Sequence, residues 1–198
     1  MKKVLFLSLL LAVKLCSGQQ LLDSASLDTV KPYESITAAD ADSLKVIKLD
    51  LHKQKLTAFP EDIRKYTNIQ YLDLSKNKIK TVPSWIGELK SLQTLVLSKN
   101  SIDSLPPEIG NLPNLKWLII NRNDLESLPP EIGNLTNLRY LDLWENNLDD
   151  FPNDLAKLTN LRWLDLRDIS ISDEDQVQIK NYLPHAEIFF SPSCQCKD

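Results

Sequence analysis

The stretch "LPPEIGNLTNLRYLDLWENNL", residues 128–148, carries leucine at intervals that recur along the chain. The same frame returns every 23 residues, in repeats that start at Val46, Ile69, Leu92, Leu115, Leu138 and Leu161. In the first five repeats, positions 1, 4, 6, 11, 14, 18 and 21 are always apolar and position 15 is always proline. A fixed period of this length predicts a stack of short, similar units rather than one globular core.

Each repeat contains a predicted β-strand. Positions 4 and 6 point to one side and positions 3, 5 and 7 to the other, which is the alternation of a strand. Proline at position 15 fixes φ as the chain returns along the outer side, and glycine at position 19 is expected to allow a tight return. One repeat cannot bury enough apolar surface to fold alone, so the stack needs a cap at each end.

The pattern LxxLxLxxNxLxxLPxxIxxLxx, built from these positions, resembles the leucine-rich repeat family, and in particular its 23-residue Leu-Pro-x-x-Ile subclass. The resemblance implies an α/β-type solenoid, an arc of six coils with a parallel β-sheet on its concave face. It also implies that the position-9 asparagines form a ladder, bonding backbone groups of the next coil. The family shares a scaffold rather than an activity, so function must be sought in the side chains that the frame leaves free.

The first 18 residues read as a secretory signal peptide. A basic start precedes the uncharged run of residues 4–13, which is too short to span a bilayer, and small residues follow it. We expect cleavage near Gly18 and a secreted, periplasmic or cell-surface protein. Lipid attachment at Cys16 is the alternative, disfavoured because Lys14 and Leu15 are poor residues before a lipidated cysteine.

The rest of the chain divides into four predicted segments. These are a leader with the N-terminal cap over residues 19–45, the repeats over 46–171, a cap over 172–190 and a tail over 191–198. In the first cap, Ser35 or Thr37 can start a short helix. In the second, Ser172 can cap a helix through about Tyr182, and "AEIFF" predicts a last strand that closes the sheet edge.

Charge and cysteine content limit the partners. The net charge is −4, and removing residues 1–18 leaves 20 basic and 27 acidic residues, or −7. An acidic chain of this kind argues against nucleic acid as a partner, and no segment after residue 18 could cross a membrane. Cys194 and Cys196 remain, either as a small disulfide or as an incidental pair. No phosphate loop or metal cluster is present in the sequence, so we expect no cofactor.

The free positions form rows across the predicted sheet, with neighbours about 4.8 Å apart. Position 3 is Lys48, Tyr71, Thr94, Trp117, Tyr140 and Trp163. Position 5 is Asp50, Asp73, Val96, Ile119, Asp142 and Asp165. Position 8 is basic at Lys53, Lys76, Lys99 and Arg122 and acidic at Glu145 and Asp168. The charged row of position 8 has two interpretations. It would orient a partner, or it is a solvated edge whose charges pair locally.

Exposed aromatic clusters usually mark contact sites, and Trp, Tyr and Arg dominate binding hot spots. We therefore predict a module that binds a protein or peptide on the concave face. The predicted contact residues are Tyr71, Trp117, Ile119, Arg122, Tyr140, Asp142, Trp144, Trp163, Asp165 and Arg167. Carbohydrate binding by the same aromatic stripe is the main alternative, and self-association through the concave faces is a third.

Catalysis is not expected. Asp142 and Asp165 are neighbours across two strands, and paired carboxylates about 5 Å apart are the arrangement of retaining glycosidases. A shallow sheet, however, offers no pocket that excludes water, and nearby arginines such as Arg167 would neutralise the pair. The histidines, His52 and His185, lie at opposite ends of the stack, so no histidine relay forms.

Overall fold

The structure is a computed structural model that describes residues 20–191. The predicted signal peptide with Cys16, and the tail cysteines Cys194 and Cys196, lie outside this range. Within it, no helix has the length and apolar character needed to cross a membrane.

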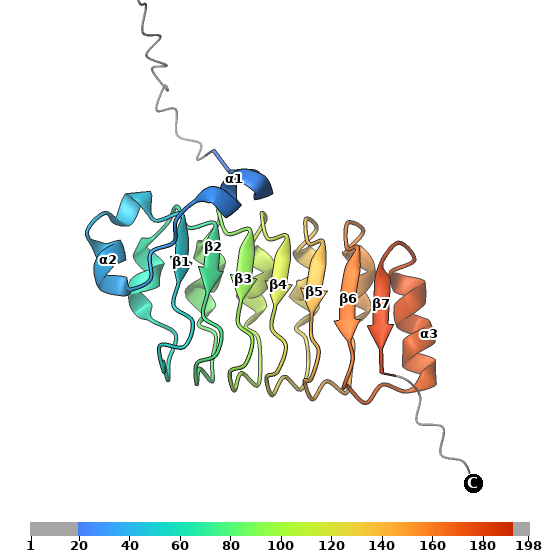
Figure 1. Ribbon diagram of the computed structural model, residues 1–198. Helices are drawn as coiled ribbons and strands as arrows, with labels where there is room; N and C mark the ends of the chain where they lie inside the picture. Colours follow the sequence, from blue (N-terminus) through green and yellow to red (C-terminus); the bar gives the residue numbers. More distant parts are fainter. Residues whose placement is uncertain (1–19, 192–198) are drawn as a thin grey trace, which may run out of the picture.

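Seven parallel strands form one open sheet in chain order (Figure 1). They are β1 (Lys48–Asp50), β2 (Tyr71–Asp73), β3 (Thr94–Val96), β4 (Trp117–Ile119), β5 (Tyr140–Asp142), β6 (Trp163–Leu166) and β7 (Glu187–Phe190). Leu49 pairs with Leu72, and Leu72 with Leu95, so each step advances the chain by 23 residues. The predicted parallel sheet of a leucine-rich repeat solenoid is confirmed.

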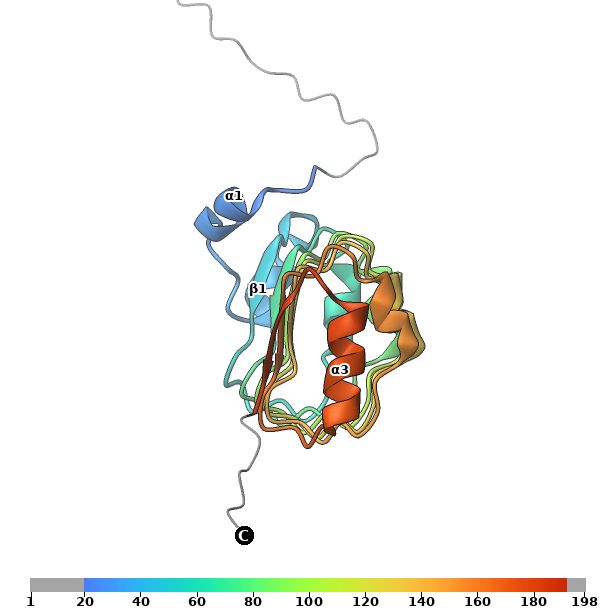
Figure 2. The ribbon, with the colours of Figure 1, turned by 90° about the vertical axis from the view of Figure 1, so that its right-hand side faces the viewer.

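Short 3-10 helices run along the side of the molecule opposite the sheet (Figure 2). They are η2 (Glu61–Lys65), η3 (Ser84–Glu88), η4 (Pro107–Asn111), η5 (Pro130–Asn134) and η6 (Asn153–Lys157). The position-15 proline is the N-cap of each one, with φ between −65° and −73°. Between these helices and the sheet lies the core, where the leucines of positions 4 and 6 are buried.

The position-9 asparagines form the predicted ladder, but in the opposite direction. The Asn100 side-chain oxygen accepts from the Ile79 amide at 3.0 Å, and its nitrogen donates to the Leu74 carbonyl at 3.0 Å. Both partners belong to the preceding coil, not to the next one. Asn77, Asn123 and Asn146 make equivalent bonds. Each asparagine thereby satisfies backbone groups that would otherwise be buried without partners.

The position-19 glycines are required for a different reason from the one expected. None of the glycines in the described range has a positive φ, so the tight-return explanation is wrong. A Cβ added to Gly110 would lie 2.3 Å from the Glu131 carbonyl oxygen, and Gly133 would meet Asp154 in the same way at 2.4 Å. Glycine is needed because neighbouring coils approach closely on the outer side.

The N-terminal end carries α1 (Ser24–Thr29), α2 (Ile36–Asp40) and η1 (Ser43–Lys45). The Ser35 hydroxyl caps α2 by accepting from the Ala38 amide at 3.1 Å. Tyr33 forms a parallel bridge with Leu49, which covers the free edge of β1. Helix α1 stands apart from α2, in front of the sheet (Figures 1 and 2).

The C-terminal end is covered by α3 (Asp173–Tyr182), which follows the Ser172 cap, and by β7, which pairs with β6 (Figure 2). Ile179 and Leu183 bury one side of α3 against the core. The helix and the strand predicted for this region are both present. The segment boundaries proposed from the sequence stay predictions.

Candidate functional site

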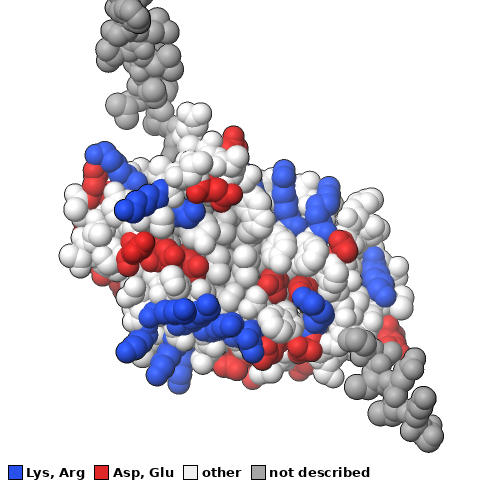
Figure 3. Space-filling model, viewed as in Figure 1, with Lys and Arg blue, Asp and Glu red and all other residues white. Residues whose placement is uncertain are grey.

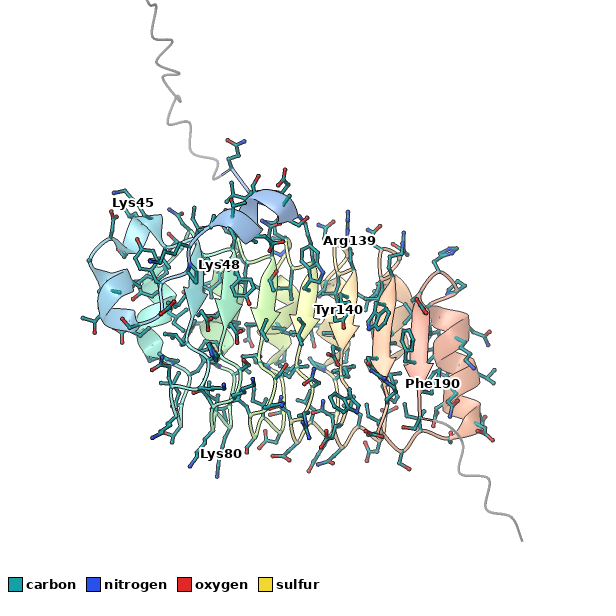
Figure 4. All side chains as sticks on the ribbon, viewed as in Figure 1. Lys45, Lys48, Lys80, Arg139, Tyr140 and Phe190 are labelled. Carbon is teal, nitrogen blue, oxygen red and sulfur yellow. The ribbon has the colours of Figure 1, made fainter. Side chains whose placement is uncertain are left out.

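We call the side of the sheet that carries positions 3, 5 and 7 the open face. The strand register places Trp117, Tyr140 and Trp163 side by side on it. Figure 4 labels Tyr140 on β5, the middle strand of these three. The Tyr140 and Trp163 rings stack, with centroids 5.6 Å apart and planes 12° from parallel. Trp163 also contacts Phe189, with centroids 4.1 Å apart. Trp117, on the other flank, makes no ring contact with any described residue. Tyr140, Trp163 and Phe189 are therefore the aromatic cluster.

Phe189 was not among the predicted contact residues. It lies in β7, paired with Asp165 of β6, and so occupies position 5 of the last strand. The sequence did predict a strand at "AEIFF", and alternation within it gives two phenylalanines that face opposite sides. The step from Asp165 to Phe189 is 24 residues instead of 23, and this extra residue hides Phe189 from a search by fixed period.

Trp144 is held in place from two sides. Its indole nitrogen donates to an Asp168 carboxylate oxygen at 2.6 Å. The Arg122 guanidinium lies 5.2 Å from the centroid of its ring and pairs with Glu145 at 2.7 Å. The cation over the ring stabilises this orientation. The basic and acidic parts of the position-8 row thus meet in an ion pair beside Trp144.

Asp142 and Asp165 were predicted as contact residues, and the structure places both below the surface of the open face. They are 8% and 3% exposed. Asp142 accepts from the Trp144 amide at 3.2 Å and from the Asn121 side chain at 2.6 Å. Asp165 accepts from the Arg167 amide at 3.1 Å and from its guanidinium at 2.6 Å. Their geometry suits them to position Trp144 and Arg167.

Position 5 has the same structural use at the other end of the sheet. Asp50 and Asp73 accept from the backbone amides two residues further on, at 3.0 and 2.8 Å. Aspartate at this position therefore closes the turn after the strand, a local bond for which the residue is well suited. This explains why the carboxylates recur without requiring catalysis.

Burial affects the ionisation of the open face. It raises the pKa of Asp142, and the nearby Asp165 charge adds to this, while the bonds from Asn121 and the Trp144 amide oppose it. Burial also raises the pKa of Tyr140. No three His, Cys, Asp or Glu residues of the described range come together as a metal site.

Tyr71 lies apart from the other predicted contact residues. Thr94 of β3 separates it from Trp117, and the Lys48 ammonium lies 4.7 Å from the centroid of its ring. Burial, followed by the charge of Asp73, raises the pKa of Tyr71 to about 12. Ile119 remains half-buried between Val96 and Asp142, in the middle of the open face.

A feature that the sequence did not reveal is the position of the leader, residues 20–30. The Leu22 amide donates to the Gln70 side chain at 2.9 Å, and its carbonyl accepts from the Gln93 side chain at 2.8 Å. Leu27 of α1 is only 3% exposed. Gln70 and Gln93 are each 1% exposed, whereas Arg139, at the same position further along, is exposed (Figure 4). The leader therefore covers one half of the open face at its upper edge.

Comparison with known proteins gives a consistent picture. Residues 26–184 match the family model described as a leucine-rich repeat region. The chain is similar to a leucine-rich repeat protein of Leptospira interrogans, with 30% identity and a TM-score of 0.60, over 82% of this chain and 49% of that one. A comparison with curated proteins gave no match.

Two further structures are similar to it. Internalin C2 of Listeria monocytogenes is 28% identical, with a TM-score of 0.65, over 74% of this chain and 62% of that one. The plant peptide hormone receptor RGFR1, in complex with RGF2, is 28% identical, with a TM-score of 0.64, over 75% of this chain and 25% of that one. The chain spans less than two thirds of the length of each of these proteins.

Proposed function

This chain belongs to the leucine-rich repeat family, and we propose that it is an exported, non-catalytic module that binds a protein or peptide on its open face. The observation that carries the proposal is the aromatic cluster of Tyr140, Trp163 and Phe189. Its rings are half-buried and remain accessible on a sheet whose core is already filled from the other side. Accessible aromatic clusters on soluble proteins usually mark contact sites.

The side chains around the cluster support this proposal because they are held rigidly. Trp144 is fixed by Asp168 and Arg122, and Arg167 is fixed by Asp165. Side chains that are already ordered lose less conformational entropy when a partner binds. With Trp117 and Ile119 they make one surface across β4 to β7, the half of the open face that the leader leaves free.

The proposed function is non-catalytic, and the structure supports a positioning role for the paired carboxylates. The paired carboxylates of Asp142 and Asp165 are bonded to neighbouring backbone and side-chain groups. Leucine-rich repeat proteins generally serve as interaction modules, and the plant peptide hormone receptor RGFR1, which is similar to this chain, forms a complex with RGF2. Export is inferred from the predicted signal peptide.

The test is the double variant Tyr140→Ala with Trp163→Ala, which removes the two stacked rings of the cluster, measured against a partner isolated with residues 19–198 as bait. We expect a loss in affinity of about 30-fold or more, because one central aromatic residue at an interface often contributes about 2 kcal/mol or more, and the contributions of two rings in contact do not simply add. Leu44→Ala serves as the control, since Leu44 is an exposed apolar residue at the N-terminal cap. Unchanged affinity in a double variant with a normal melting temperature would disprove this placement of the site.

Carbohydrate binding is the second candidate, and one observation favours it. The nearly parallel rings of Tyr140 and Trp163 form a flat platform, next to the polar side chains of Asn121 and Arg167. A glycan array on residues 19–198 distinguishes the two functions. A signal that disappears in Tyr140→Ala would support sugar binding, and protein capture without any glycan signal would support the first proposal.

A further inference from the structure

Six lysines gather at the edge of the sheet where β1, β2 and β3 end. This lysine ridge consists of Lys53, Lys55, Lys76, Lys78, Lys80 and Lys99. Figure 3 shows the group in blue along the lower edge, and Figure 4 shows Lys80 pointing down, away from the sheet. All six are exposed, and none of their ammonium groups has an ion-pair or hydrogen-bond partner among the described residues.

Lysines elsewhere in the described range differ in this respect. Lys65 pairs with Asp40, and Lys45 and Lys157 pair with aspartates on their own helices. Lys90 and Lys116 donate hydrogen bonds, and Lys48 and Lys180 lie over aromatic rings. Outside the ridge, Lys31 alone among described lysines has no such partner. Because like charges repel one another, an unpaired group of this size does not stabilise the fold.

The backbone presents these lysines in a fixed and unfavourable conformation. Lys53, Lys76 and Lys99 have φ of 56°, 58° and 57°. Their amides donate to carbonyls of the following coil at 3.0, 2.8 and 2.9 Å, which holds the three at equivalent places. Glycine or asparagine adopts this left-handed conformation more readily than lysine does. The same conformation recurs at position 8 of every coil, so the repeat imposes the backbone while the residue type at this place varies.

The same edge changes sign after the ridge. Position 8 continues as Arg122, Glu145 and Asp168, all with the same left-handed backbone. Arg122 is neutralised by Glu145, and Glu126 and Asp149 add exposed acids nearby (Figure 3). A long, uniformly acidic chain lying along this edge would therefore be attracted at one end and repelled at the other. The basic part spans three strands, about 10 Å, which matches about three extended residues.

We propose that the lysine ridge binds a short acidic stretch of an extended peptide whose other end is basic and lies near Asp149 and Asp168, two exposed acids with no ion-pair partner among the described residues. This inference rests on the proposed function, which gives a protein or peptide as the class of partner. It adds the charge pattern of that partner and states which end of the partner lies over which strands. The acidic end lies over β1 to β3 and the basic end over β5 and β6. Complementary charges of this kind fix the register of a partner and suppress wrong ones.

The test uses labelled synthetic peptides with four glutamates, a four-residue Gly-Ser spacer and four lysines, made in both orders. Binding is followed by fluorescence anisotropy at low salt. The triple variant Lys53→Asn, Lys76→Asn and Lys99→Asn should weaken binding about tenfold or more, from the loss of three exposed charge pairs. Its melting temperature should stay the same or rise, because asparagine suits the left-handed backbone. The control with the same net charge is Lys31→Asn, Lys90→Asn and Lys180→Asn.

Three results would overturn the inference. These are no binding to the unmodified chain, an equal loss in the control variant, or tighter binding of uniformly acidic peptide, heparin or an oligonucleotide than of the mixed peptide. The proposed function is tested separately through Tyr140 and Trp163. If those variants lose their partner while the ridge variant binds the mixed peptide normally, the ridge inference alone is wrong. If the ridge behaves as expected and the variant with both rings removed keeps its partner, the placement of the aromatic site alone is wrong.

Discussion

The two halves of the open face have the same backbone structure and differ in the side chains at the positions that the repeat pattern does not fix. In both halves the leucines of positions 4 and 6 are buried, and the position-9 asparagines bond the preceding coil. Position 2 is Gln70 and Gln93 in the first half, where the leader buries both. At the same position in the second half, Arg139 and Arg162 are exposed.

This difference shows how the chain divides its surface. The repeat pattern fixes the place of each side chain. The residue types at the positions outside the pattern then determine which segment or partner binds to the open face. Amide side chains at position 2 can both donate and accept, so they bind the leader's backbone. Arginines at that position have no acceptor to offer the leader amides. The leader therefore ends where the aromatic half begins, and the two halves can be separated by mutation.

The largest expected effect comes from detaching the leader with Leu27→Asp. Leu27 is buried to 3% exposure, and a buried leucine contributes about 2–3 kcal/mol. Burying a carboxylate at this place is unfavourable, so the side chain would move into water and α1 would detach from the sheet. We expect proteinase K to cleave faster within residues 20–31, and the Leu22 amide to exchange its hydrogen faster.

Leu44→Asp is the matched control for this experiment. It makes the same chemical change at a leucine that is 68% exposed, and should alter neither measurement. Equal protection of the Leu22 amide in Leu27→Asp and the unmodified chain would show that the leader is not held by this side chain.

A smaller effect is expected from Gln93→Ala, measured against Arg162→Ala at the same position of the other half. The Gln93 side chain donates to the Leu22 carbonyl and to Gln70, both at 2.8 Å, and accepts from Lys116 at 2.6 Å. Its removal leaves buried polar groups without partners, at about 1–3 kcal/mol. Arg162→Ala should change the free energy of unfolding by about 0.5 kcal/mol or less, because the side chain is exposed.

Urea unfolding of the two variants measures this difference directly. A loss in Gln93→Ala no greater than that in Arg162→Ala would contradict the role assigned to the glutamine pair.

The fold could be predicted from the sequence because its determinants repeat. Apolar residues, proline and asparagine at fixed positions specify the strand, the return and the ladder in each coil. The pattern therefore remains recognisable even where one repeat departs from it. The reason for Gly110 could not be predicted, because it depends on how closely the next coil's Glu131 carbonyl approaches. The direction of the asparagine ladder also depends on stacking, which a single repeat does not encode.

The candidate site was predictable only where it follows the period. The rows of positions 3 and 5 predicted the places of Trp117, Tyr140 and Trp163, and the strand pairs have that register. Phe189 was missed because the last strand is offset by one residue. The leader was missed because its contacts to Gln70 join segments about 50 residues apart, without any sequence periodicity to connect them.

The smallest expected effect concerns a charge buried in the aromatic half, at Asp142. Burial raises the pKa of this carboxyl in the folded chain above its value in the unfolded chain. Between the two pKa values the folded state binds more protons, so the group's contribution to stability falls as pH rises through this range. Asp142→Asn removes the titration while its carbonyl oxygen can still accept from the Trp144 amide. The stability of the variant minus that of the unmodified chain should therefore increase as the pH rises above about 4, the ordinary pKa of an aspartate. Carboxylates other than the neighbouring Asp165 titrate alike in both proteins and cancel in this difference, which urea unfolding at each pH measures. A difference that is constant or that falls with pH would mean that the bonds from Asn121 and Trp144 outweigh the cost of burying the charge.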